Sequence, residues 1–360
     1  EEYRIQTEES AAWNDEFLSQ RSRLASEAHR IDAERDDRIR GRFGELVGRL
    51  SLPHGDSKVE RSVAPVFETQ LPQDADQRIY VWVRDGWSID ENSVRADARQ
   101  AGNNSPTIFA FIPKRSADDL RHHLIDCKAA TATLERRGVP NTPEGTEARS
   151  AMQTTRQTAE GRVNELLEEA FSGARIFQGG GNEIVGNDLQ EMVLEAAGNS
   201  LQRLYPQFHV ADPLGWAKVY EKARKGAPDA LKAVGYDGEP AGNPVCKAVL
   251  GSIAGGKKGA EIRALFEAPP YGWPRDAVDG AIQVLLIAGV IRAQDDRGQT
   301  LDPRDLERKA IGKANLKVES ATVTTPQRIQ IRKLLQKAGF SAKQGEELSY
   351  ATPFIEQLQY

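Results

Sequence analysis

The sequence predicts a helix-rich α+β protein with a small α/β layer, a long antiparallel helical hairpin and a winged-helix module. Three observations support this prediction. Long stretches place apolar residues at steps of three, four or seven, which is typical of helices with one buried face. Apolar stretches at 78–83 and 107–112 flank a helix-like segment, as in a βαβ unit. In the C-terminal third, helical segments precede a β-hairpin, which is the order of a winged helix-turn-helix.

Composition limits the class of protein before any motif is considered. A chain of 360 residues predicts roughly two or three compact units. With 39% hydrophobic and 28% charged residues, and no apolar run of about 18 residues, we expect no membrane span. Two cysteines, Cys127 and Cys246, exclude a disulfide scaffold and fit a reducing cytoplasm. The net charge of −5 requires any nucleic-acid contact to be a local patch.

Residues 1–115 predict an N-terminal helical region followed by the small α/β layer. A short strand is expected at 3–6, and an amphipathic helix or helix pair at 8–49. A strand at 59–67 contains Pro65, which would confine it to a sheet edge. The strands at 78–83 and 107–112, joined by a helix at 88–100, are expected to be parallel.

Residues 116–187 predict the helical hairpin. Ser116 is expected to cap a helix that runs to residue 137, and Thr142 a second helix that opens with Pro143. A heptad-like seam follows in that second helix, at Ala148, Met152, Thr155, Ala159, Val163, Leu166 and Ala170. We therefore expect an antiparallel pair at 116–172 that serves packing rather than chemistry. A connector of short helices is expected at 188–241.

Residues 242–320 predict the winged-helix-like module. Helices are expected at 245–253, 259–266 and 274–288, with a hairpin at 290–301. A stiff turn precedes the third helix, and we expect its residues to shape the chain rather than to touch a ligand: Tyr271, Gly272, Trp273 and Pro274. Residues 321–360 predict a basic helical segment that is truncated, and both chain ends suggest a piece of a longer protein.

No catalytic, cofactor-binding or metal site is predicted. The segment 251–258 approaches the P-loop pattern, but Lys258 occupies the position that requires a hydroxyl, and a helix rather than a strand precedes it. The triple-glycine loop at 178–182 lacks a dinucleotide-binding spacing, and a helix is expected before it, so it predicts a joint. The adjacent His122 and His123 point to different sides of a helix and cannot share a metal.

Two segments are candidates for macromolecular contact. The helix at 274–288 offers Arg275 on its polar face beside Asp276, Asp279 and Gln283, which favours a protein partner over phosphates. Residues 304–343 hold ten Lys or Arg and three acids, a net of +7. In the helix expected from residue 325, Ile329, Ile331, Leu334 and Leu335 should point inward. Its basic residues should line the outer face and meet either phosphates or an acidic protein: Arg328, Arg332, Lys333 and Lys337.

The stretch from Phe266 to Asp279, which contains Pro-Tyr-Gly-Trp-Pro, resembles the BrxC/PglY family. These are the large P-loop ATPases of the bacterial BREX anti-phage defence system. Further blocks are similar to the family in the same order along the chain: residues 3–13, 83–87, 175–181, 255–263 and 324–332. The resemblance spans nearly the whole chain, but none of these blocks carries a catalytic role.

The resemblance implies that this chain is a non-catalytic portion of a BREX ATPase. ATP and Mg²⁺ would belong to an N-terminal P-loop region that this sequence lacks. The implied partners are other BREX components, with double-stranded DNA as a further candidate and a homo-oligomer formed through the parent ATPase. Two alternatives stay open: a winged-helix DNA-binding regulator, and an enzyme whose site is built across segments.

Overall fold

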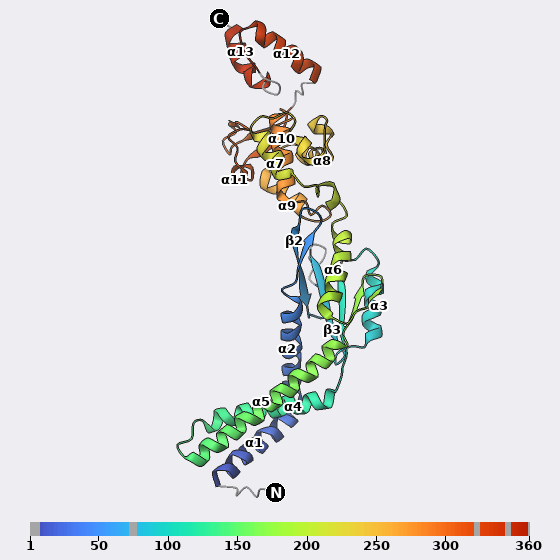
Figure 1. The fold of residues 1–360 in the computed structure, drawn as a ribbon, viewed down its shortest axis with the longest axis vertical. Helices are drawn as coiled ribbons and strands as arrows, with labels where there is room; N and C mark the ends of the chain where they lie inside the picture. Colours follow the sequence, from blue (N-terminus) through green and yellow to red (C-terminus); the bar gives the residue numbers. More distant parts are fainter. Residues whose placement is uncertain (1–7, 72–77, 320–324, 343–346, 359–360) are drawn as a thin grey trace. The chain divides into compact units, whose positions relative to one another are not determined.

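The computed structural model describes residues 8–71, 78–319, 325–342 and 347–358, and the strand expected at 3–6 lies outside them. The chain is a helix-rich α+β protein with one mixed and one antiparallel sheet (Figure 1). It forms two compact units. The first comprises Glu1–Leu52 and Arg61–Arg203, and the second Pro53–Glu60 and Leu204–Tyr360.

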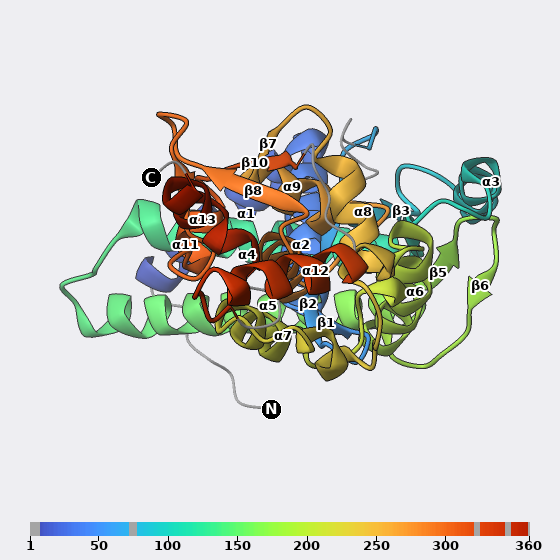
Figure 2. The ribbon, with the colours of Figure 1, turned by 90° about the horizontal axis from the view of Figure 1, so that it is seen from above.

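Four long helices make up the helical part of the first unit: α1 (Glu8–Ser26), α2 (Ala28–Val47), α4 (Ala117–Arg137) and α5 (Pro143–Ser172). The expected helix pair at 8–49 is confirmed. Helices α4 and α5 pack side by side in both views, and α1 packs on α4 (Figures 1 and 2). Six of the seven seam residues of α5 are buried, and Thr155 alone is exposed.

The two predicted helix caps behave differently. The Thr142 hydroxyl accepts a hydrogen bond from the Gly145 amide at 3.1 Å, as expected of an N-cap. The prediction for Ser116 was wrong. Its backbone is left-handed, with φ of 44°, and its side chain makes no cap bond. The Ser116 hydroxyl instead lies 3.4 Å from the Glu169 carboxylate of α5.

The mixed sheet has six strands in sequence order: β1 (Ser51–His54), β2 (Val59–Val66), β3 (Ile79–Asp85), β4 (Ile108–Ile112), β5 (Arg175–Gln178) and β6 (Glu183–Ile184). Strands β2, β3 and β4 are parallel, and α3 (Glu91–Ala101) connects β3 to β4, so the predicted βαβ unit is confirmed. In the sheet order β2 is not the edge strand that Pro65 led us to expect, because β1 lies outside it. Since β1 has four residues and β2 has eight, β1 can pair with only part of β2.

The triple-glycine loop joins β5 to β6, which corrects the expectation that a helix precedes it. Gly180 and Gly181 have φ of 91° and 83°, a region that favours glycine. The Gly180 amide donates to the Ala98 carbonyl at 2.8 Å, which ties this turn to α3. Helix α3 covers one face of the sheet through an apolar cluster of Val94, Ala98, Phe109, Phe111 and Phe177. Helix α6 (Leu189–Leu204) follows the turn.

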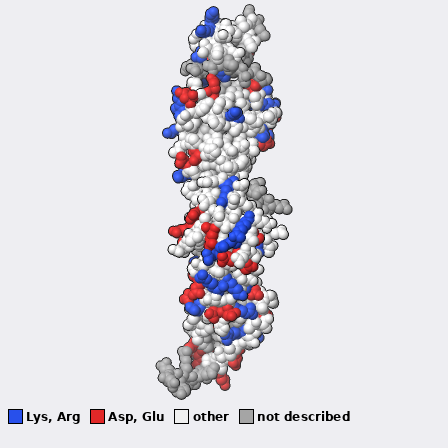
Figure 3. Space-filling view, turned by 90° about the vertical axis from the view of Figure 1, so that its right-hand side faces the viewer, with Lys and Arg blue, Asp and Glu red and all other residues white. Residues whose placement is uncertain are grey.

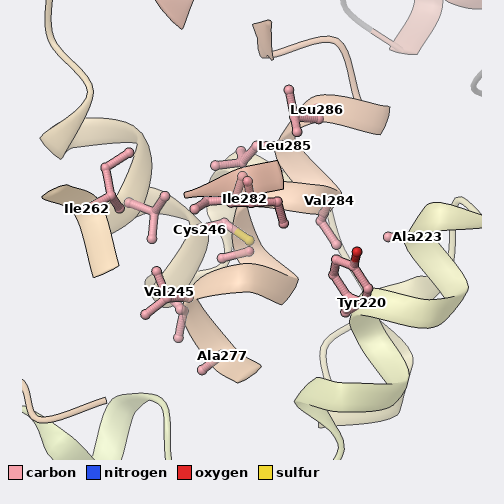
Figure 4. Close-up of a cluster of buried hydrophobic side chains, with 14 of the residues drawn as sticks. Tyr220, Ala223, Val245, Cys246, Ile262, Ala277, Ile282, Val284, Leu285 and Leu286 are labelled. Carbon is pink, nitrogen blue, oxygen red and sulfur yellow. The ribbon is translucent and has the colours of Figure 1, made fainter. Parts of the chain in front are cut away.

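The second unit is built around one buried helix, α10 (Arg275–Ile287), whose residues from Ala277 to Leu286 are all buried. Tyr220 and Ala223 of α7 (Trp216–Arg224) and Cys246 of α8 (Pro244–Ser252) belong to the same core (Figure 4). Ile262 of α9 (Gly259–Glu267) completes it. The core is therefore a helix enclosed by neighbours, not a helix lying on a surface.

A four-stranded antiparallel sheet packs with these helices in the order β7 (Lys257–Lys258), β10 (Asn315–Val318), β8 (Ile291–Gln294) and β9 (Thr300–Leu301). The predicted hairpin corresponds to β8 and β9 and is confirmed. Strands β7 and β10 were not predicted. Short helices α11 (Arg308–Ile311), α12 (Thr325–Lys337) and α13 (Ala351–Leu358) complete the chain, with a 3₁₀ turn, η5 (Glu347–Tyr350), before α13.

Candidate functional site

The turn at 271–274 is part of the core of the second unit. Trp273 is 2% exposed, and its ring stacks on Phe266 with centroids 4.7 Å apart and planes 5° apart. Its indole N–H donates to the Gln207 carbonyl at 2.8 Å. Tyr271 makes T-shaped ring contacts with both Phe266 and Trp273. Gly272 has a φ of 62°, a backbone conformation that favours glycine at this turn. These side chains fix the entry of the chain into α10.

Arg275 is exposed and held by this chain's own acid. Its guanidinium donates to both oxygens of Glu267, at 2.6 and 2.9 Å. The outward polar face expected for this helix was wrong, because Asp279 and Gln283 are buried. Only the first turn of α10 therefore has charged groups near solvent, and a nucleic-acid groove cannot receive the rest of the helix.

Asp279 is the centre of a buried ion cluster. Its carboxylate accepts from Arg263 at 2.7 Å, and Arg308 lies 4.0 Å from its other oxygen. Arg308 also pairs with Asp276 and lies over the ring of Tyr220, 4.4 Å from the centroid. Burial raises the pKa of the Asp279 carboxyl, and the guanidinium of Arg263 opposes that shift.

This cluster links α7, α9, α10 and α11 through charge. Arg263 donates in addition to the Arg308 carbonyl at 2.6 Å, and the Tyr220 hydroxyl donates to the Leu306 carbonyl at 3.1 Å. An acid of raised pKa is a candidate for catalysis where it faces a cleft. Asp279 is 1% exposed and is surrounded by cations that bridge helices, so its geometry is that of a structural ion pair.

The predicted basic face of α12 divides into two pairs. The carboxylate of Glu347, which is fully buried, lies 3.0 Å from Arg332 and 4.0 Å from Arg328. Arg328 also donates to the Ala288 carbonyl. Both arginines are therefore turned toward protein, which corrects the outward orientation expected for them.

Lys333 and Lys337 remain exposed, one turn apart. The inward orientation expected for Ile329 and Leu334 was wrong, since both are exposed, whereas Leu335 is buried. Lys343, the last basic residue of the 304–343 segment, lies outside the described residues. No periodic pattern in the sequence pointed to Glu347, because it follows a segment of Lys, Gln, Gly and Glu rather than an amphipathic helix.

Other ionisable groups of the described chain also serve the fold. Cys127 donates to Glu160 at 3.0 Å, and Glu160 in turn pairs with Arg38 of α2. Burial, followed by the hydrogen bond to Glu160, raises the pKa of the Cys127 thiol to about 12, and burial raises that of Cys246 to about 12. Thiols of such high pKa are weak nucleophiles. Within residues 8–71, 78–319, 325–342 and 347–358, no group of three or more His, Cys, Asp or Glu side chains is arranged to hold a metal.

Surface charge does not form one continuous basic field on the face that Figure 3 shows. Lys and Arg atoms alternate with Asp and Glu atoms in the lower part of this view, and much of the rest is uncharged. Ion pairs between helices bring opposite charges together in the first unit, such as Arg42 with Glu168 at 2.5 Å and Lys128 with Glu34 at 2.5 Å. Such a surface attracts polyanions only through local groups of cations.

The segment 251–258 runs from the last residues of α8, through a turn, into β7. Gly255 and Gly256 have positive φ of 81° and 104° in that turn. The helix expected before this segment is present. A P-loop instead follows a buried strand, so the glycines connect a helix to a short strand.

Comparison with protein-family models, with curated proteins and with solved structures finds no match for this chain. In the part of the chain that the structure describes, no helix is both long enough and apolar enough to cross a bilayer.

Proposed function

We propose that this chain is a non-catalytic portion of a BREX phage-defence ATPase that serves assembly with partner proteins. One observation supports the non-catalytic role: the carboxylates Asp279 and Glu160, whose pKa values are shifted, are engaged in intramolecular pairs. Asp279 is held by Arg263, and Glu160 by Arg38 and Cys127. Carboxylates engaged in this way hold helices together, and a base that is already paired within the fold is poorly placed for chemistry.

The resemblance of six blocks to the BrxC/PglY family gives the proposal its biological setting. ATP and Mg²⁺ would act in a P-loop region of the parent protein, and no residue of this chain is assigned to them. Other BREX components are the expected partners, in the cytoplasm of a bacterium.

The second unit supports protein docking more than DNA binding. Its order of helix, short strand, two helices and hairpin suits a winged-helix-like module. In a DNA-reading winged helix the third helix exposes a face to the major groove, whereas α10 is buried from Ala277 to Leu286. The rival hypothesis of a DNA-binding regulator requires an exposed helix to read the major groove, and α10 does not provide that exposed face. The rival enzyme would need an ionisable group in an open cleft, and Asp279 is enclosed.

Competition in cells tests the proposal. Excess of this chain in a bacterium that carries a working BREX system should occupy the partners of the parent ATPase and lower protection against phage. Asp279→Leu, which removes the centre of the ion cluster and should destabilise the second unit, should compete less because less of it is folded. Undiminished protection at high levels of the folded chain would contradict an assembly role.

A further inference from the structure

The four-stranded sheet of the second unit has one face in the core and one face turned outward. Ile291, Ala293 and Leu316 lie on the inner face and are buried. Side chains alternate between the two faces of a strand, and residues paired across antiparallel strands share a face. The register therefore places six polar side chains together on the outer face, none of them acidic and none of them buried: Lys258, Arg292, Gln294, Thr300, Asn315 and Lys317.

The three cations of this outer face come from β7, β10 and β8, which lie side by side in the sheet (Figure 2). Lys317 of β10, the middle strand, forms no ion pair with the residues that the structure describes. Lys258 lies 3.5 Å from Asp296, and Arg292 lies 3.5 Å from Glu319. The side chains of these two cations are 56% and 42% exposed, and ion pairs of this kind contribute little. An incoming phosphate group can therefore compete for both of them.

The sheet and its turns are basic, although the net charge of the chain is −5. Residues 257–258, 291–301 and 312–319 contain six Lys or Arg and three acids, a net of +3. One of these acids, Asp295, accepts hydrogen bonds from the amides of Arg297 and Gln299 and so serves the turn between β8 and β9. The sheet is thus a local group of cations of the kind that attracts a polyanion.

We propose that this outer face binds the phosphodiester backbone of a nucleic-acid duplex. Phosphate oxygens are commonly contacted by Lys, Arg, Asn, Gln and Thr side chains, and the six residues of the outer face are all of these types. Contacts to phosphates hold a duplex without reading its sequence. The site does not use α10, whose polar side chains are buried, and it does not depend on the proposed assembly role.

An acidic protein fits this face less well than phosphates do. The centres of protein interfaces are rich in apolar and aromatic side chains, and the outer face has none. Single-stranded nucleic acid also fits less well, because its bases stack on aromatic side chains in the proteins that bind it. Cations and amides without an apolar centre are suited to the phosphate oxygens of a duplex.

Fluorescence anisotropy of the whole chain with labelled duplexes of about 20 base pairs, from about 50 to about 200 mM salt, tests the proposal. DNA and RNA duplexes are titrated separately, because both present phosphodiesters and the comparison identifies the preferred one. The wild-type chain should bind at least one of them with a dissociation constant of about 10 µM or tighter at about 50 mM salt, whatever the base sequence.

Removal of the three cations should weaken this binding. Lys258→Gln/Arg292→Gln/Lys317→Gln should raise the dissociation constant by at least about tenfold. The slope of the logarithm of affinity against the logarithm of salt concentration should fall by about 2 to 3, because three phosphate contacts are lost.

Two further variants control for total charge and for damage to the fold. Lys218→Gln/Lys222→Gln/Lys225→Gln removes the same charge from exposed sites on α7 and just after it, and should bind like the wild type. Lys258→Arg/Lys317→Arg keeps the cations of the outer face and should retain the affinity. Loss of binding in the glutamine variant alone then comes from lost charge.

Three results would overturn the proposal. Neither duplex could bind at about 50 mM salt. Binding could be weakened equally by the control on α7, or instead by Lys333→Gln/Lys337→Gln, which would place the contact elsewhere. The chain could also bind poly-glutamate in preference to both duplexes, which would assign the outer face to an acidic protein. None of these results contradicts the assembly role, so the two proposals fail separately.

Discussion

Trp273 shows how much one side chain contributes to the second unit. It is buried, stacked on Phe266 and bonded through its indole to the Gln207 carbonyl. Trp273→Ala should lower the free energy of unfolding by about 3–5 kcal/mol, because it leaves a cavity and an unpaired carbonyl. Urea unfolding followed by circular dichroism measures this. Trp273→Phe keeps the ring stack and should cost clearly less; equal losses would mean that the stack contributes little.

Glu160 should contribute to the loss of folding stability of the first unit at low pH. The hydrogen bond from Arg38 lowers the pKa of the Glu160 carboxyl below 4.5, although burial opposes the shift. The folded state then binds fewer protons than the unfolded state. Its contribution is fully present above pH 4.5 and is lost as the pH falls through the folded pKa.

Glu160→Gln removes this titrating group. The variant should be less stable than the wild type at neutral pH and should lose less of its stability between pH 6 and about pH 3. Urea unfolding at a series of pH values measures both effects. Glu165→Gln is the control, since Glu165 forms an exposed pair with Arg162 on the same helix. Parallel pH curves for the wild type and Glu160→Gln would contradict the assigned cause.

At the scale of elements, a buried ion pair holds α10 in the second unit. Asp279→Leu should destabilise the chain by about 3–5 kcal/mol, because Arg263 is then buried without its partner. The double variant Arg263→Met/Asp279→Leu should recover much of that loss, since an apolar pair replaces an ion pair. Thermal unfolding of the three chains measures the recovery. A double variant no more stable than Asp279→Leu would show that the cluster has a role beyond charge pairing.

Helix α12 depends on Glu347 for its position. Arg328→Gln/Arg332→Gln should increase amide hydrogen exchange in α12, because the buried carboxylate then lacks both cations. Lys333→Gln/Lys337→Gln removes the same charge from exposed sites and should leave that exchange unchanged. Equal exchange in the two variants would contradict the inward orientation of the arginines.

Helices and strands whose apolar residues recur at a regular spacing could be predicted from the sequence. Elements that form only through contact with distant parts of the chain could not. The seam of α5 and the βαβ unit follow from local periodicity and composition. Strand β7 has two residues, and β10 becomes a strand only through pairing with β7 and β8, so neither has a local pattern. Ser116 is a good cap by residue type, but its left-handed backbone directs its hydroxyl to Glu169 instead.

The candidate contact residues show the same limit. The sequence identified a basic helix at 325–337, yet a distant acid, Glu347, decides which of its cations face outward. Asp279 and Gln283 look like a solvent-facing stripe in a helix taken alone. They are buried because α7 and the segment before α11 cover that side: Gly280 faces Trp216, and Gln283 donates to the Pro303 carbonyl at 2.6 Å.

At the scale of the whole molecule, two compact units combine many intramolecular ion pairs with buried apolar clusters. This arrangement suits a protein that presents surfaces, because its charges are used to fix helices.

Binding of the purified chain to each separately purified BREX protein tests the central claim most directly. Isothermal titration at physiological salt should give a dissociation constant of about 10 µM or tighter for at least one of them, and binding should not require ATP. Absence of heat and of co-elution with every BREX protein, for a chain shown to be folded, would contradict the account.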